Sequence, residues 1–239
     1  TIVRDLDDTS LLARNFSSLG YVSSVLGNYV EAYFFYQEAL AKRRETGDKG
    51  DILRSLIDLG LMEQMQGRYD KALAYAAEGM DLVRETGEEA GGVVLATNVG
   101  MIHDDQGGYA AAIKSLTEAV DRARTIGDKN YLAFSLLYLG RTLIHLGDPA
   151  DAEKRLAEVE RLVAETENAA LRPELLGEQA EIQGLRGDLD RCLKTLAEAL
   201  RRAQALGDRR LVILTRLSLG KWEAAAGRPS GRAHLRWVA

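Results

Sequence analysis

The 239-residue sequence contains little cysteine, proline or aromatic side chain. Its single cysteine, Cys192, cannot form an internal disulfide and has no second cysteine with which to build a zinc site. Three prolines and 6% aromatic residues favour helix over strand. The apolar runs are short and the first residues do not resemble a signal sequence. We therefore expect a cytoplasmic protein without membrane contact, in which Cys192 is a small apolar core residue.

Sequence motifs of catalysis and cofactor binding are also absent. The sequence has no G-x-S-x-G, H-E-x-x-H, G-x-x-x-x-G-K or G-x-G-x-x-G and no cysteine pair. A metal site needs at least three converging ligands, and the chain has three histidines in all. We expect no enzymatic activity, no cofactor and no bound metal.

The net charge of −5 is unevenly distributed. Residues 191–239 contain eleven lysines and arginines but three acidic residues, a net charge of +8 that leaves −13 for residues 1–190. Such a basic end could steer an acidic partner. Nucleic-acid binding usually adds aromatic side chains among the arginines, and this end has few. Solvated helix faces are therefore the favoured interpretation, and nucleic-acid or anion contact through the basic end is the alternative.

Glycines recur along the chain every 40 residues, as Gly20 and Gly60 do. Repetition at a fixed period of this length is typical of solenoid proteins. Leucine, tyrosine and alanine positions keep the same step. One glycine series has Ala180 in its single gap and the other has no gap; they are Gly20, Gly60, Gly100, Gly140 and Gly220, and Gly27, Gly67, Gly107, Gly147, Gly187 and Gly227.

A third repeated feature joins a glycine to an acidic residue, as in Gly47-Asp48. Glycine can end a helix in the left-handed conformation, and the acidic side chain can cap the next helix. Each period therefore predicts two helices of about 18 residues, near 49–66 and 69–86 in the second unit. In the fifth unit Asn168 can still serve as the cap, and Pro173 falls in a first turn that tolerates proline.

The pattern predicts an all-α fold, an α-solenoid in which antiparallel helix pairs stack and cover one another's apolar faces. Residues 9–208 give five repeats of equal length, and 209–226 give the first helix of a sixth. Residues 1–8 align with the end of a preceding second helix, so we expect the chain to be an excerpt of a longer protein. Residues 227–239 are expected to form a tail or a partial capping helix.

The repeated pattern resembles the tetratricopeptide repeat family. The usual repeat of that family has about 34 residues, and these units are longer by more than a helical turn. They resemble its lengthened subclass, found in kinesin light chains, Leu-Gly-Asn-type adaptors and bacterial signalling regulators. The resemblance implies a right-handed superhelix that serves as a binding scaffold. The first unit carries the family pattern as Phe16, Leu19-Gly20, Gly27-Asn28-Tyr29, Ala32, Tyr36 and Ala39-Leu40.

In this family the first helix of each pair lines a concave groove that receives an extended peptide or a partner helix. Position by position, the resemblance implies a surface of mixed charge around apolar side chains, which suits a peptide of mixed charge. The amide of Asn98 can pair with both polar groups of a bound peptide backbone. The partner-binding candidates are Arg14, Tyr21, Arg54, Asp58, Gln64, Asn98, Met101, Asp105, Arg141 and His145.

The segment 99–109, VGMIHDDQGGY, has the composition of an active site, but the repeat explains it. Gly107 and Gly108 fall at the turn between two helices, so they are not a phosphate-binding loop. His103 occupies a position that packs between helices, and we expect it to be half-buried.

Trp222 is expected to pack against a following unit. Either the tail covers it, or the C-terminal end is open and supports a homodimer.

The leading hypothesis for function is a protein- or peptide-binding module, the sensing or scaffolding part of a signalling or transcription-regulatory protein. A third possibility is peptide sensing with a change of superhelical pitch hinged at the fifth unit.

Overall fold

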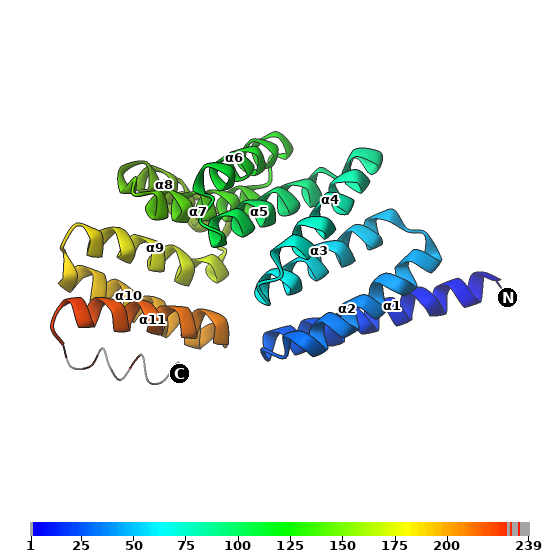
Figure 1. The fold of residues 1–239 in the computed structure, drawn as a ribbon, viewed down its shortest axis with the longest axis horizontal. Coiled ribbons are helices and arrows are strands. Elements are labelled where there is room, and N and C mark those ends of the chain that lie inside the picture. Colours follow the sequence, from blue (N-terminus) through cyan, green and yellow to red (C-terminus); the bar gives the residue numbers. More distant parts are fainter. Residues whose placement is uncertain (1, 229, 231–233, 235–239) are drawn as a thin grey trace. The chain divides into compact units, whose positions relative to one another are not determined.

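The structure, a computed structural model, describes residues 2–228, 230 and 234, with side chains from residue 8 onward. The secondary structure of these residues is helical throughout (Figure 1). The helices fall into two compact units, residues 1–127 and residues 128–239. The predicted all-α fold of paired helices is therefore confirmed.

Unit 1 consists of three helix pairs, in which α1 packs on α2, α3 on α4 and α5 on α6. The second helix of a pair also packs against the first helix of the next pair, as α2 does with α3 and α4 with α5, and α3 contacts α5 directly. The helices are α1 (Ile2–Val25), α2 (Tyr29–Thr46), α3 (Lys49–Met65), α4 (Tyr69–Thr86), α5 (Glu89–Asp105) and α6 (Tyr109–Ile126).

Unit 2 repeats this arrangement, with α7 on α8, α9 on α10, and α11 packed against both α10 and α9. The first helices α7 and α9 also contact each other. The elements are α7 (Lys129–Leu146), α8 (Pro149–Thr166), the short 3-10 helix η1 (Ala169–Leu171), α9 (Arg172–Leu185), α10 (Leu189–Leu206) and α11 (Arg209–Ala225).

The joints between pairs have the predicted chemistry where the acidic residue is aspartate, whereas the Glu88 side chain forms no capping hydrogen bond at the start of α5. Gly47 ends α2 with a φ of 74°, in the left-handed region that favours glycine. Asp48 then caps α3, since its Oδ1 accepts a hydrogen bond of 2.8 Å from the Asp51 N–H. The joint without glycine is kept by Glu167, which takes a φ of 53°, and Asn168 accepts from the Ala170 N–H at 3.2 Å. Asn168 thus caps the short helix η1 with which the fifth unit begins.

The N-terminal helix differs from the sequence expectation. The repeat predicts a joint at residues 7–8, but α1 continues from Ile2 to Val25 without a break. The physical reason is that Asp7 stands where other joints have a glycine, and aspartate does not readily take the left-handed conformation that ends a helix.

The apolar core is built by stacking successive pairs. Leu59 and Met62 of α3 are 0% and 3% exposed because they pack into one cluster with Tyr36 of α2. The residues of α1 in the same register, Leu19 and Val22, are 48% and 54% exposed. These positions of a first helix therefore face the preceding second helix.

The prediction that Trp222 packs against a following unit is wrong, because Trp222 packs against the preceding helix pair. Trp222 is 8% exposed and belongs to a cluster with Ala180 of α9 and Cys192 of α10, and its Nε1 donates to Glu181 Oε1 at 3.1 Å. Its register matches Met62, which also faces the preceding pair, so it offers no exposed anchor for a dimer. The predicted tail lies largely outside the described residues.

Gly184 and Gly177 of α9 provide a matched test of this packing. A Cβ at Gly184 would come within 2.5 Å of two ring atoms of Trp222, whereas one at Gly177 would meet nothing within 4 Å. We expect Gly184→Ala to lower the free energy of unfolding by about 1–3 kcal/mol. Gly177→Ala should raise it by up to about 1 kcal/mol, because alanine is the better helix former. Urea unfolding followed by circular dichroism measures both, and equal stabilities would contradict this packing.

Candidate functional site

The predicted site residues lie on the first helices of the pairs. Eight of the ten belong to unit 1, and Arg141 and His145 lie on α7 of unit 2. In unit 1, α1 carries Arg14 and Tyr21, α3 carries Arg54, Asp58 and Gln64, and α5 carries Asn98, Met101 and Asp105.

Contacts between neighbouring first helices fix which positions meet. In unit 2, Arg141 of α7 pairs with Glu178 of α9, which lies 37 positions further along the chain. In unit 1, Gln64 of α3 meets Asp105 of α5, which lies 41 positions further along the chain. We call the surface of α1, α3 and α5 that carries Tyr21, Asp58, Leu61, Asn98 and Met101 the unit 1 face.

Two polar side chains of the unit 1 face have no partner. Asn98 is 9% exposed, yet its amide forms no side-chain hydrogen bond with any described residue. The half-buried carboxylate of Asp58 forms neither a hydrogen bond nor an ion pair within the same part of the chain. Their polar atoms are not among the fully buried unpaired ones of the described residues, so they reach the protein surface. Their hydrogen-bonding capacity is therefore available to a bound molecule.

Gln64 adds a third open acceptor beside this face. Its Nε2 donates to Asp105 Oδ2 at 2.9 Å, which ties the end of α3 to the end of α5. The Gln64 side chain is 8% exposed, and its Oε1 is buried without a partner. Two of the predicted residues are thus brought into direct contact.

Burial dominates the electrostatics of Asp58. Removal from water raises the pKa of the Asp58 carboxyl from 3.8 to about 6, and the charges of Arg43 and Arg54 offset part of this increase. Neither arginine bonds to it, since Arg43 donates to Ser55 Oγ at 2.7 Å and Arg54 pairs with Asp51. Asp58 is therefore an acceptor whose charge changes just below neutral pH.

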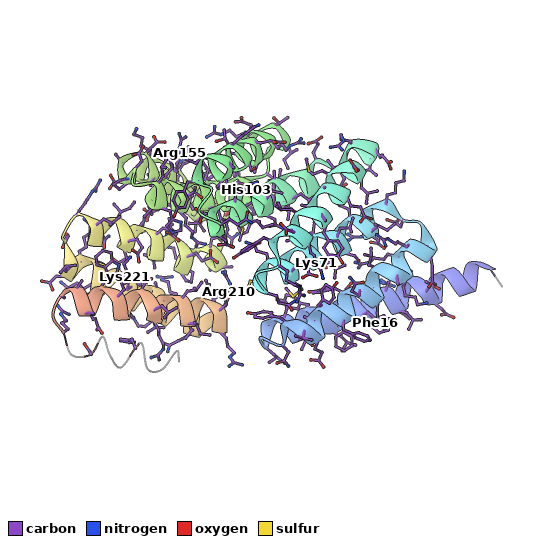
Figure 2. All side chains as sticks on the ribbon, viewed as in Figure 1. Phe16, Lys71, His103, Arg155, Arg210 and Lys221 are labelled. Atoms are coloured by element: carbon purple, nitrogen blue, oxygen red, sulfur yellow. The ribbon has the colours of Figure 1, made fainter. Side chains whose placement is uncertain are left out.

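The first helices of unit 2 have their polar groups paired internally. Arg141 Nε lies 2.6 Å from Glu178 Oε1, and Arg210 Nη2 lies 2.6 Å from Glu174 Oε1. Tyr138 donates to Glu174 Oε2 at 3.2 Å, and the Arg141 guanidinium lies 4.7 Å from the Tyr138 ring centre. Figure 2 shows Arg210 at the start of α11. We call these five residues of α7, α9 and α11 the unit 2 network.

The unit 2 network has no net charge, because two arginines balance two glutamates. Burial, followed by the charge of Glu174, raises the pKa of Tyr138 to about 12, so its hydroxyl remains a donor. Burial alone would lower the pKa of Arg141, but Glu178, Tyr138 and Glu174 raise it overall. The repeat pattern did not indicate the roles of Glu174 and Arg210. The available signal was the presence of opposite charges at first-helix positions of adjacent repeats.

The segment around His103 behaves as the repeat predicts. His103 is half-buried on α5 (Figure 2), and its carbonyl accepts a hydrogen bond of 2.8 Å from the Gly108 N–H in the turn that follows. Among the described residues, no group of three or more histidine, cysteine, aspartate or glutamate side chains is arranged to hold a metal ion. None of the described helices is long and apolar enough to cross a membrane.

Several basic side chains in the described part of residues 191–239 pair with acidic side chains. Arg202 lies 2.6 Å from Glu198, and Lys221 lies 2.6 Å from Glu181. Arg228 pairs with Asp190 at 2.7 Å. Such local pairing weakens the attraction of this end for a polyanion.

Comparison with known proteins finds a family match and several similar structures. The sequence matches the family model described as tetratricopeptide repeat over residues 11–85 and 93–165. A search of curated protein sequences gives no match.

Three solved structures illustrate the likeness of fold. The apo form of RapI has 14% identity and a TM-score of 0.77, with 96% of this chain and 82% of RapI covered. The Rap conjugation gene regulator of plasmid pLS20, in complex with the Phr* peptide, has 12% identity and a TM-score of 0.80, with 95% of this chain and 61% of the regulator covered. Aspartyl phosphate phosphatase F from Bacillus subtilis has 12% identity and a TM-score of 0.76, covering 97% and 61%. The chain thus spans about three fifths of the last two proteins.

Breaking the unit 2 network on one side should destabilise the protein. Arg141→Met removes the cation beside Glu178, whose side chain is 11% exposed, and should lower the free energy of unfolding by about 3 kcal/mol. The double variant Arg141→Met, Glu178→Leu should recover most of this loss, because no unpaired charge remains buried. Urea unfolding measures both, and a double variant no more stable than the single one would contradict the pairing.

The pKa of Asp58 makes stability depend on pH. Because the folded-state pKa of about 6 exceeds the ordinary 3.8, the folded protein holds this proton more tightly than the unfolded chain does. The ionised carboxylate therefore disfavours folding above about pH 6, and this cost fades as the pH falls towards 4. Asp58→Asn should raise the urea midpoint more at pH 7.5 than at pH 4.5. A carboxyl carbon NMR titration of Asp58 centred near pH 4 would contradict the assignment.

Proposed function

This chain belongs to the tetratricopeptide repeat family, as its sequence pattern indicates, and on that premise we propose that it binds an extended peptide or a partner helix along the unit 1 face. The binding would serve as the sensing step of a larger signalling or transcription-regulatory protein. The proposal includes no cofactor.

One observation carries the proposal: the unit 1 face contains nearly buried polar groups that nothing in the described chain satisfies. The Asn98 amide offers a donor and an acceptor, and Asp58 offers an acceptor. A peptide backbone presents N–H and C=O groups that match these. Leu61 and Met101 are half-buried on the same face and provide apolar contact for its side chains.

The comparisons support a peptide rather than another class of ligand. The pLS20 regulator, which this chain resembles in fold, was solved with the Phr* peptide. At 12% identity that likeness concerns the fold, so the identity of the peptide is open.

The remaining predicted residues contribute to the proposal unequally. Arg14 and Tyr21 are exposed on α1, and Tyr21 is 64% exposed. Arg141 is committed to Glu178 and Glu174, so a ligand there would have to displace ion pairs. Partner binding by Arg141 and His145 stays a prediction, weaker than that for unit 1.

Two other functions receive less support. Contact with nucleic acid or another polyanion through the basic end is disfavoured by its ion pairs with Glu181 and Asp190. One structure of similar fold is named a phosphatase, but at 12% identity that likeness concerns the fold, and the sequence carries none of the catalytic motifs named above, so we propose a binding role.

Affinity selection from a random heptapeptide pool tests the proposed function. The wild-type chain should enrich a set of peptides, and the best should bind Asn98→Ala about 10–30-fold more weakly, because about two hydrogen bonds to the peptide backbone are lost. Isothermal titration or fluorescence anisotropy measures the affinity.

Ser218→Ala is the matched control, because Ser218 of α11 has the same repeat position as Asn98 but lies outside the unit 1 face. Its affinity for the selected peptides should equal that of the wild type. A pool that gives no enrichment, or peptides that bind Asn98→Ala and Asp58→Asn as tightly as the wild type, would overturn the proposal.

A further inference from the structure

The second helix of the first pair carries an apolar cluster on its exposed side. Val30 and Phe34, one turn apart on α2, are 76% and 57% exposed. The Phe34 ring meets Phe35 edge-on at 5.8 Å, and Phe35 stacks on Phe16 of α1 at 6.4 Å. Figure 2 shows Phe16 where α1 runs beside α2. We call Val30, Phe34 and Phe35 the α2 cluster.

The other second helices have no such cluster. At the repeat position of Phe34 they carry Ala74, Lys114, Lys154 and Lys194. At the position of Val30 they carry Asp70, Ala110, Ala150 and Asp190. Exposed lysine and aspartate are the normal occupants of a solvated helix face, so valine and phenylalanine here require a different explanation.

The exposure of Phe34 is not a consequence of its place in the first pair. Lys114 of α6 is exposed although the pair α3–α4 precedes it, and Ala74 of α4 is exposed although α1–α2 precede it. A helix pair stacked on α1 and α2 would therefore leave Phe34 uncovered. Leu19 and Val22 differ, because their register positions are covered by the preceding second helix wherever one is present.

A shallow depression with acidic surroundings adjoins the cluster. It has a volume of about 700 Å³ and is lined by the α2 cluster together with residues 27–29 and Glu31. Glu31 accepts a hydrogen bond from Ser23 at 2.9 Å, and Glu38 lies one turn beyond Phe34 on α2. Neither glutamate forms an ion pair with a described residue. The depression thus combines aromatic walls with the carboxylate of Glu31, and the carboxylate of Glu38 lies one turn further along α2.

We propose that the α2 cluster is a second docking surface, separate from the unit 1 face, for a protein segment that presents a large apolar side chain beside lysine or arginine. Aromatic side chains contribute much of the binding energy at interfaces, and the carboxylates favour a cationic neighbour. A second copy of the same surface would bring the glutamates of both copies together. An anionic lipid surface would be repelled for the same reason.

A designed probe tests this surface on the full chain. The probe is a fluorescein-labelled alanine-based helical peptide of four turns, with tryptophan and leucine on one face and lysines beside them. Anisotropy should detect binding to the wild type, and amide NMR shifts should map it to residues 27–38. Phe34→Lys, which installs the residue of three other repeats, should weaken binding at least tenfold. A probe with glutamate in place of lysine should bind at least tenfold more weakly.

Two matched variants separate this surface from other effects. Ala74→Lys makes the same kind of change at the same repeat position of α4 and should leave the affinity unchanged. Asn98→Ala should also leave it unchanged, so failure here is distinguishable from failure of the proposed function. Val30→Asp provides a second disruption if Phe34→Lys alters the circular dichroism spectrum.

The contrary results are equally specific. No binding to the wild type, or binding that is indifferent to Phe34→Lys and Val30→Asp, would overturn the proposal. A dimer in sedimentation that Phe34→Lys dissociates would assign the cluster to a second copy instead. Binding to phosphatidylglycerol vesicles that Phe34→Lys abolishes would assign it to a membrane.

Discussion

Leu59 and Met62 of α3 are buried only because Tyr36 and the rest of α2 lie against them. The same contact between a first helix and the preceding second helix recurs in unit 2, where Trp222 of α11 packs against α9 and α10. No helix pair covers its own apolar face, so this stacking supplies the core of each unit. Within each unit, this contact sets the spacing of successive helix pairs.

Stacking also decides which polar groups meet. Once the second helices hold the pairs at a fixed spacing, neighbouring first helices bring together side chains that are about one repeat apart, such as Arg141 and Glu178 at 37 positions and Gln64 and Asp105 at 41. A polar side chain there is satisfied either by a neighbouring helix or by a group outside the chain, such as solvent or a ligand. In unit 2 a neighbouring helix satisfies it, as Arg141 does for Glu178. In unit 1 Asp58 and Asn98 have no such partner among the described residues, so their polar groups remain open to solvent or to a ligand.

The parts of the fold that the sequence could predict are those set by local chemistry. Gly47 and Asp48 end one helix and start the next by their own conformational and capping preferences, so that boundary was predictable. Pairings between repeats were harder, because Arg141 and Glu178 meet across an offset of 37 positions, which is shorter than one full repeat. The packing of Trp222 against the preceding pair was not predictable for a similar reason, because the repeat alone does not show whether a position faces the preceding or the following pair.

The candidate site could be predicted only in part, for a related reason. The first helices were the correct elements for Gln64 and Asp105, which touch, but their sequence positions do not reveal that Gln64 Oε1 is left unpaired. Phe34 was not foreseen, because its significance lies in the lysines that replace it in other repeats. Comparing every register position across the repeats, polar ones included, would have exposed it.

The balance of hydrogen-bond strengths favours the unit 1 face over the unit 2 network as the place for the proposed peptide binding. A hydrogen bond to a charged group contributes about 1.5–3 kcal/mol, whereas a neutral one contributes about 1 kcal/mol. A peptide amide at Glu178 would have to displace Arg141 and exchange the stronger interaction for the weaker one. The same amide at Asn98 displaces no protein group, so the full gain is retained. A buried ion pair of this kind adds little to stability, but it occupies the polar groups between α7 and α9, and for this reason we place the proposed backbone binding on the unit 1 face.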